Sequence, residues 1–593
     1  MLSIILSWLF ITYIAFIQGV FSIKNLCRFF KIEAKLNDLH FIIVCISGLA
    51  IISFYAFLWH FFFYINIEFL IFLLIITITQ TFFYRKSLGA YIQLCKKNII
   101  NTNFLLFPVF ISSILIIAYF SLPVTSHADE GSYFLPSVHW MQQYKIIIGL
   151  GNLHSRLAFN SSWHLLSAVF SFPFVSKGYF NDLNGLIYLY CLLYALNGLN
   201  RIYKGETSFI NYLKTIFFLP VLALYFGAAD EILLIPTNFI GSMTSDLPAL
   251  LFVCLIGITF VEKINNNALG FDIKSLVIIL LSVFVITIKL STTPLALLSI
   301  YLFFREVFSK KYLFSSKIAL FPIIFILPWI VRNILLSGYI VFPFSQLNIL
   351  SVDWKVPFVR TLIYQKLVKS WAIEPTLNWD IGWLMPMSEV FPIFYAKLSF
   401  IQTVIINNVF LAVFLTFCYI VYGVLKRKFQ NDTYKSYLIL AITYLIGIIF
   451  WFYSAPDIRF GLGFILFCSI FLIGLLFHWA TKDFYKYFSA IILLIYLGIN
   501  GIYYRNIYKI IYDNAEKNLL VIPERPIPQI PTQTYLISNK LKVNVVESSC
   551  SFVDLPCITI HEKVDLLMRG NTIEEGLKPA DPDKKDFYEE WKW

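Results

Sequence analysis

The residues best suited to chemistry lie in the string PVTSHADEGSYFLPSVHWMQQY, directly after a long apolar run. Asp129 and Glu130 stand side by side there, with His127 just before them. A carboxylate at the mouth of a helix near a bilayer is partly desolvated, which raises its pKa and suits a general base. Adjacent carboxylates do not share a helix face, so we expect one to act while the other holds a metal, a water or a neighbour. Alternatively, both are solvated acids in the first turn of the next helix.

A second polar group follows in the string GLGNLHSRLAFNSSWHLL. His154, Arg156 and His164 are crowded there into an otherwise apolar segment. An arginine beside histidines can bind a phosphate through two parallel hydrogen bonds. The alternative is an interfacial arginine that contacts lipid headgroups.

Two basic residues stand at the ends of apolar runs. Arg332, followed by Asn333, lies in IFILPWIVRNILLSGYIVFPF, about one helical turn inside the run. Burying an unpaired charge at that depth is costly, so Arg332 is a candidate to bind the phosphate of a lipid-linked donor. Alternatively, its guanidinium extends to the membrane interface by snorkelling. Lys289, in FVITIKLSTTP, has the same two interpretations.

Further acidic residues also stand at the ends of apolar runs. Asp246, in GSMTSDLPALL, precedes one run, where a helix N-cap is the plain alternative to a functional role. The string FYSAPDIRFGLGF places Asp457 and Arg459 in a short turn between two runs. Arg459 can hold a pyrophosphate oxygen or a sugar there. The alternative is a surface ion pair of Asp457 with Arg459, which contributes little.

The elements that position these residues are membrane-spanning helices. The chain is 59% hydrophobic and 13% charged, whereas soluble chains carry about 25% charged residues. Its apolar runs lack alternation, which favours helices over barrel strands. We therefore predict an all-α polytopic membrane protein with about fourteen spans. The expected spans are residues 2–22, 40–64, 67–84, 104–122, 183–200, 215–229, 247–261, 275–288, 293–304, 318–336, 400–425, 434–453, 460–478 and 488–504.

Basic residues collect in alternate short loops, as the positive-inside rule predicts for cytoplasmic loops. This pattern explains the formal charge of +12 without a nucleic-acid partner. With fourteen spans, both termini lie on the extracytoplasmic side of the inner membrane. That parity requires residues 161–175 to form an interfacial or re-entrant helix, because the segment is too short to span.

The expected organisation is a set of N-terminal spans (1–122), an outward loop (123–182), a transmembrane core (183–504) with an outward loop (337–398), and an outward tail (505–593). The long segments all face outward, where no nucleotide-sugar is available. A catalyst on that face needs a donor carried across the membrane, usually on a lipid.

The tail contains strand-like runs and is predicted to form a small α+β domain. In an oxidising compartment Cys550 and Cys557, in CSFVDLPC, can form a disulfide. The alternative is two buried thiols. Only His561 lies nearby, so no metal site is expected in the tail. Whether the chain needs a divalent cation elsewhere stays open.

The acidic pair, the string PWIVRNILLSGYIVFPF and the outward tail together resemble the GT-C superfamily of membrane glycosyltransferases. These enzymes take sugar from a polyprenyl-phosphate or related lipid, and the PW-x-x-RN string is similar to that of their mannosyltransferase-like members. More specifically, the whole chain looks like a bacterial membrane-protein family of Bacteroidetes type that has no assigned activity. The resemblance implies that Asp129, or failing that Glu130, is the catalytic base and that Arg332 contacts the donor phosphate. In the superfamily the acidic pair usually follows the first span, whereas here it follows the fourth.

We therefore expect an inverting transferase in which Asp129 deprotonates the hydroxyl of an envelope glycan, lipid or protein. Arg332 and Arg459 would stabilise the leaving phosphate, with Arg156 and Lys289 as further donor-binding residues. One alternative is a polymerase or ligase of lipid-linked glycans that relies on arginines. Another is a transporter, a flippase or a non-catalytic assembly subunit. The sugar, the acceptor and the oligomeric state are not indicated.

Overall fold

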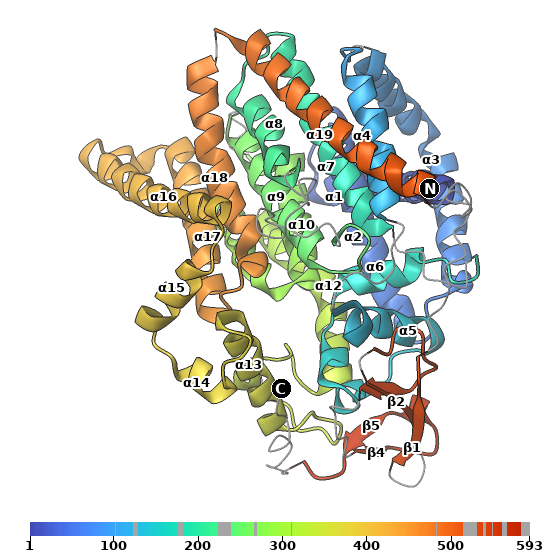
Figure 1. Ribbon diagram of the computed structural model, residues 1–593. Coiled ribbons are helices and arrows are strands. Elements are labelled where there is room, and N and C mark those ends of the chain that lie inside the picture. Colours follow the sequence, from blue (N-terminus) through green and yellow to red (C-terminus); the bar gives the residue numbers. More distant parts are fainter. Residues whose placement is uncertain are drawn as a thin grey trace.

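The computed structural model describes most of the chain, including every expected site residue except His127. The described residues are 1–100, 102–121, 129–175, 182–222, 239–265, 270–309, 311–481, 483–513, 530–537, 541–547, 549–559 and 566–582. His127 lies outside them. The described residues are mostly helical, with short strands near the C-terminus (Figure 1).

Each segment expected to span the membrane contains a helix, although the segments 104–122 and 215–229 are described only as far as 121 and 222. The apolar composition explains this, because a chain in lipid must satisfy its backbone hydrogen bonds internally. The helices are α1 (Leu2–Phe30), α2 (Phe41–His60), α3 (Ile67–Ile100), α4 (Leu106–Phe120), α7 (Leu183–Tyr203), α8 (Phe209–Leu222), α9 (Asp246–Asn265), α10 (Ile273–Ile288), α11 (Ala296–Phe308), α12 (Tyr312–Ser337), α16 (Phe400–Leu425), α17 (Asp432–Ser454), α18 (Ile458–Thr481) and α19 (Tyr485–Asp513).

Among the described residues, eight helices are long and apolar enough to cross a membrane. They are α1, α2, α9, α17, α18, and the parts Ile67–Gln93 of α3, Leu313–Ser337 of α12 and Gln402–Leu425 of α16. Three apolar helices are shorter, namely Leu106–Phe120, Ile273–Ile288 and Tyr485–Gly498. These helices make the chain a multi-pass membrane protein. Helix α19 continues to Asp513, so the tail begins later than the expected residue 505.

The segment expected to be interfacial or re-entrant contains only a short helix, α6 (Ser162–Phe170). Its nine residues extend roughly 14 Å, about half the thickness of the hydrocarbon core. All nine residues are buried inside the protein, and α6 packs against α2 and α5 (Leu135–Gln143). The helix is therefore covered by protein and does not lie on the surface of the molecule.

The segments expected to face outward lie at one end of the helical bundle (Figure 1, bottom). The first contains the π-helix η2 (Glu130–Phe134), α5, and the 3-10 helices η3 (Leu150–Asn152) and η4 (Ser155–Ala158). The second contains α13 (Phe358–Ile373), α14 (Trp379–Leu384) and α15 (Met387–Ala396). The third is the small sheet region of the tail.

The tail forms two small sheets. Strand β1 (Gln533–Ile537) pairs antiparallel with β2 (Leu541–Val546), which pairs in parallel with β3 (Cys557–Thr559). Strand β4 (Leu566–Met568) pairs antiparallel with β5 (Leu577–Pro579). A disulfide joins Cys550 to Cys557.

The tail docks on the first outward segment through backbone hydrogen bonds. The N–H of Cys550 donates to the carbonyl of Gly131 at 3.1 Å, and the N–H of Leu577 donates to that of Ile148 at 2.8 Å. Apolar side chains of the strands share one buried cluster with α5 and η3. The tail therefore packs directly beside the acidic pair.

Candidate functional site

Arg156, at the start of η4, connects the acidic loop to α13. Its Nη1 lies 3.3 Å from Oδ1 of Asp129 and donates to the hydroxyl of Ser132 at 2.9 Å. Its Nε donates to the hydroxyl of Tyr364 at 3.1 Å. The guanidinium lies 5.4 Å from the ring centre of Tyr133. Arg156 is thus held in place at a partly exposed position and orients the Asp129 carboxylate.

The two neighbouring carboxylates have different surroundings. The Asp129 side chain is 29% exposed, whereas Glu130 is only 1% exposed. Glu130 accepts hydrogen bonds from the hydroxyl of Ser242 and from the N–H of Met243. Burial raises the pKa of Glu130 to about 8, against the opposing effect of these hydrogen bonds. Glu130 therefore binds the segment before α9, and Asp129 is the more accessible acid.

Lys289 and Asp246 form an ion pair between the end of α10 and the start of α9. Their side chains are 17% and 10% exposed. The Lys289 ammonium also lies 4.1 Å from the ring centre of Phe460. The N–H of Asp246 donates to the hydroxyl of Thr244 at 3.3 Å, and its carboxylate binds Lys289. Asp246 is therefore the partner of a cation, beyond any role at the start of α9.

Arg459 and Asp457 form a second pair at the turn between α17 and α18. The Nε of Arg459 lies 3.0 Å from Oδ2 of Asp457, and the two side chains are 20% and 19% exposed. The guanidinium lies 4.9 Å from the ring centres of Trp371, on α13, and Phe460. This stacking distinguishes the pair from a solvated surface contact.

The three ion pairs lie close enough to act on one another. Arg459 interacts electrostatically with Asp457, Asp246 and Asp129. Tyr133 interacts in the same way with Asp129, Arg156 and Asp246. We call this group the charged cluster, and it consists of Asp129, Arg156, Asp246, Lys289, Asp457 and Arg459. Its members come from separate segments of the chain and meet beside α13.

Arg332 is buried in α12, with 3% of its surface exposed. Its Nη1 donates to the side-chain oxygen of Asn160, which is itself fixed by two hydrogen bonds with Trp329. Within the part of the chain that the structure describes, Arg332 forms no ion pair, and its Nε has no hydrogen-bond partner. The adjacent Asn333 is also buried. The guanidinium therefore stays inside the protein and does not snorkel.

Of the predicted site histidines, the two that the structure describes, His154 and His164, are buried and neutral. Burial, together with Arg156 and Arg360, lowers the pKa of His154 well below its usual value. Burial and the nearby Arg332 lower the pKa of His164 to about 3. The His164 ring lies 6.3 Å from that of Tyr133. His164 therefore connects the surroundings of Arg332 with the charged cluster.

Several contacts of the site have no signal in the sequence. Tyr364 and Trp371, which contact the charged cluster, stand in strings without any chemical motif. Ser242 and Met243 stand close to Asp246 in the chain, but nothing in that string marks them as partners of Glu130. Tyr133 follows the acidic pair closely, which is a weak local signal. Across the described ranges, no group of three His, Cys, Asp or Glu residues could hold a metal ion.

Comparison with known proteins matches residues 1–466 to a family model described as a domain of unknown function (DUF8201). No curated protein matches the chain. No solved structure matches it either. The matched residues include the charged cluster and Arg332 but not the strands of the tail.

Proposed function

The chain belongs to the DUF8201 family, a domain of unknown function, and we propose that it is a GT-C-like membrane glycosyltransferase. It moves a sugar from a polyprenyl-phosphate donor to an envelope acceptor at the outer face of the bacterial inner membrane. The proposal includes fourteen membrane crossings with both termini outside. One observation carries it: Arg459 interacts with Asp129, Asp246 and Asp457, which come from three distant parts of the chain.

Asp129 is the proposed general base. Its carboxylate is partly exposed and is oriented by Arg156, so an acceptor hydroxyl can approach it. Asp129 takes the hydroxyl proton while the acceptor oxygen forms a bond to the anomeric carbon. The bond from that carbon to the donor phosphate oxygen breaks, and its electron pair leaves on the phosphate. Base catalysis of this kind contributes about 10²- to 10⁴-fold.

Arg459 and Lys289 are the proposed partners of the leaving phosphate. Asp457 and Asp246 hold these cations in place, and the aromatic ring of Phe460 lies against both. Cations fixed in a partly buried site stabilise developing negative charge without reorganising. The ion pairs therefore keep the cations in position for a donor.

Arg332 adds a positive charge near His164. An unpaired ionisable residue within a membrane helix is a candidate for function, because its burial is otherwise costly. The Nε of Arg332 has no hydrogen-bond partner among the described residues, which supports a role in binding an anionic group. We assign it to the donor phosphate, together with Arg459.

The test uses purified protein in nanodiscs with a panel of polyprenyl-phosphate and polyprenyl-diphosphate sugars. Mass spectrometry follows release of the free lipid carrier. We expect release to fall by at least about 100-fold in Asp129→Asn. The matched control is Asp554→Asn, which changes an exposed aspartate of the tail and should leave release unchanged.

Two other outcomes separate the alternatives. Full activity of Asp129→Asn with loss of activity in Arg459→Gln would favour a polymerase or ligase that relies on arginines. Intact bound lipid and no release from any donor would exclude the transferase and favour a transporter or an assembly subunit.

A further inference from the structure

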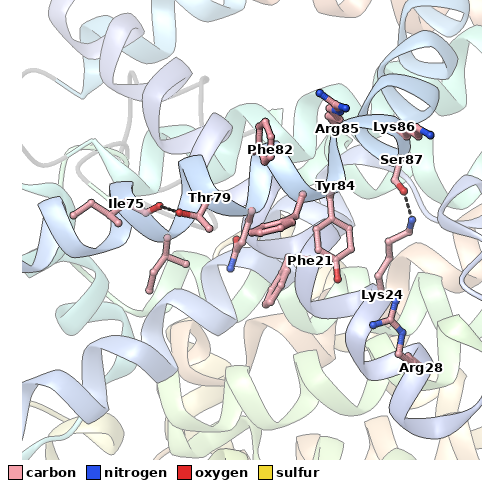
Figure 2. A pocket seen from close by; sticks show the side chains of 13 residues that line it. Phe21, Lys24, Arg28, Ile75, Thr79, Phe82, Tyr84, Arg85, Lys86 and Ser87 are labelled. Atoms are coloured by element: carbon pink, nitrogen blue, oxygen red, sulfur yellow. Dashed lines mark hydrogen bonds between the residues drawn. The ribbon is translucent and has the colours of Figure 1, made fainter.

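A pocket of about 950 Å³ lies between α1 and α3, away from the charged cluster (Figure 2). The end of α1 that forms it lies beside the start of α12, since Lys317 donates to the carbonyl of Phe29 at 3.3 Å. Arg332 lies near the opposite end of α12. The pocket therefore belongs to the other end of the helical bundle.

The pocket is strongly basic. Its lining includes Lys24 and Arg28 from α1, and Arg85 and Lys86 from α3, but no Asp or Glu. Lys24 donates to the hydroxyl of Ser87, and none of the four cations forms an ion pair within the described part of the chain. Four cations without a carboxylate create a positive potential that attracts an anion.

The pocket also has an apolar wall. Ile75, Phe82 and Phe83 line it and are 60%, 65% and 75% exposed, as expected for side chains that face lipid. From Ile75 to Lys86, α3 rises about 16 Å, close to the depth of one leaflet of the hydrocarbon core, which is about 15 Å. The cations thus lie at one end of a groove that extends along the acyl region.

A polar side chain lies between these two regions. Gln80 lines the pocket and is 6% exposed, and its Oε1 has no hydrogen-bond partner among the described residues. An acceptor buried without a partner is unfavourable. A hydroxyl-bearing ligand, or a water bound with it, would supply the missing donor.

We propose that this pocket binds an anionic phospholipid of the cytoplasmic leaflet. Arg28, Arg85 and Lys86 hold the phosphate, for which arginine offers two parallel hydrogen bonds. One acyl chain lies along Ile75 and Phe82. Basic pockets between membrane helices on the cytoplasmic side bind anionic lipid headgroups by this chemistry. A free phosphate shares the charge but would leave the apolar wall unused.

The experiment measures lipid retention in nanodiscs of phosphatidylcholine with increasing phosphatidylglycerol. Native mass spectrometry counts the phosphatidylglycerol molecules that stay bound after the protein is released from the nanodisc. The pocket variant is Arg28→Gln/Arg85→Gln/Lys86→Gln, which changes exposed side chains only. The matched control is Lys426→Gln/Arg427→Gln/Lys428→Gln. It removes the same charge from exposed residues after α16, in a loop that the basic pattern assigns to the same membrane side.

We expect retention to weaken roughly 10- to 100-fold in the pocket variant and less than about 2-fold in the control. Equal weakening in both variants would overturn the site, because it would reflect surface charge alone. The single variant Arg85→Gln repeats the test if the triple variant unfolds. Inorganic phosphate should not displace the lipid at millimolar concentration. Displacement would identify a free-phosphate site and overturn the lipid assignment, as would the absence of any retained phosphatidylglycerol.

Discussion

Asp129 and Glu130 are adjacent in the chain, yet Asp129 pairs with Arg156 at a partly exposed position while Glu130 is buried against Met243. A π-helical turn begins at Glu130, and the two side chains contact different parts of the protein. One acid is therefore available to a substrate, and the other fixes the segment that leads into α9. The predictions below address these two roles and the surroundings of the site.

Glu130→Gln should change how stability depends on pH. The carboxyl has a pKa of about 8 in the folded protein against 4.5 as its ordinary value. Because the pKa is raised in the folded protein, protonated Glu130 stabilises the folded state in full below pH 4.5. This stabilisation is lost as the pH rises to about 8. Glutamine imitates the protonated form. We expect the thermal midpoint of Glu130→Gln in nanodiscs to depend less on pH between 5 and 8 than that of the natural protein.

The control for this prediction is Gln533→Ala, which changes an exposed uncharged residue of β1 and should keep the natural pH dependence. If the thermal midpoint changes with pH in the same way in Glu130→Gln and in the natural protein, the buried carboxyl does not control the pH dependence.

Arg459→Gln should lower kcat for carrier release by about 10²- to 10³-fold, with a smaller effect on KM. The reason is that charge on the leaving phosphate develops mainly in the transition state. Arg459→Lys keeps the charge but loses the planar stacking on Trp371, so it should retain part of the activity. A change in KM alone would assign Arg459 to ground-state binding.

The matched control is Arg569→Gln. Arg569 also pairs with an aspartate, Asp353, at 3.0 Å, but it lies in the tail outside the charged cluster. A loss of activity there equal to that of Arg459→Gln would point to a general structural effect.

Asn160→Ala should destabilise the protein by about 1–3 kcal/mol, because it removes the hydrogen-bond acceptor of the buried Arg332 guanidinium. The double variant Asn160→Ala/Arg332→Met should cost less than the sum of the two single changes. Unfolding in mixed micelles measures both. Trp329→Phe, which removes only one donor to Asn160, is the milder control. Strict additivity would mean that the two side chains do not interact.

Cys550→Ser/Cys557→Ser should loosen the docked tail, with a local loss of about 2–3 kcal/mol. Hydrogen exchange should then increase in residues 549–559. It should also increase in residues 129–134, because Cys550 donates to Gly131. Cys418→Ser, at an exposed free cysteine, should change neither segment. Peptide mapping of the natural protein under non-reducing conditions that finds free Cys550 and Cys557 would contradict the prediction.

Local sequence patterns predict the helices well, because an apolar run in lipid has few alternatives to a helix. They also single out Asp129, Arg332 and Arg459, since charges next to apolar runs are conspicuous. They do not reveal partners. Arg156 and Tyr364 are separated by 208 positions, and no feature of either string connects them.

Residues packed inside the protein and residues that face lipid are both apolar, so the sequence does not distinguish them. The apolar residues of α6 fit an interfacial helix as well as a helix packed inside the protein. Trp371 contacts Arg459, but one aromatic residue gives little signal in a chain that is 18% aromatic. Only the folded arrangement distinguishes these cases.

The docking of the tail has a consequence for which substitutions the chain can accept. Main-chain atoms of Cys550 and Leu577 make the hydrogen bonds to Gly131 and Ile148, so these two bonds constrain backbone position and do not depend on the residue type. Gly131 is different, because an added Cβ would lie 2.0 Å from the hydroxyl of Ser549. The two hydrogen bonds therefore tolerate changes of residue type in the tail, whereas alanine at Gly131 would require the side chains of Ser549 and Ser551 to shift.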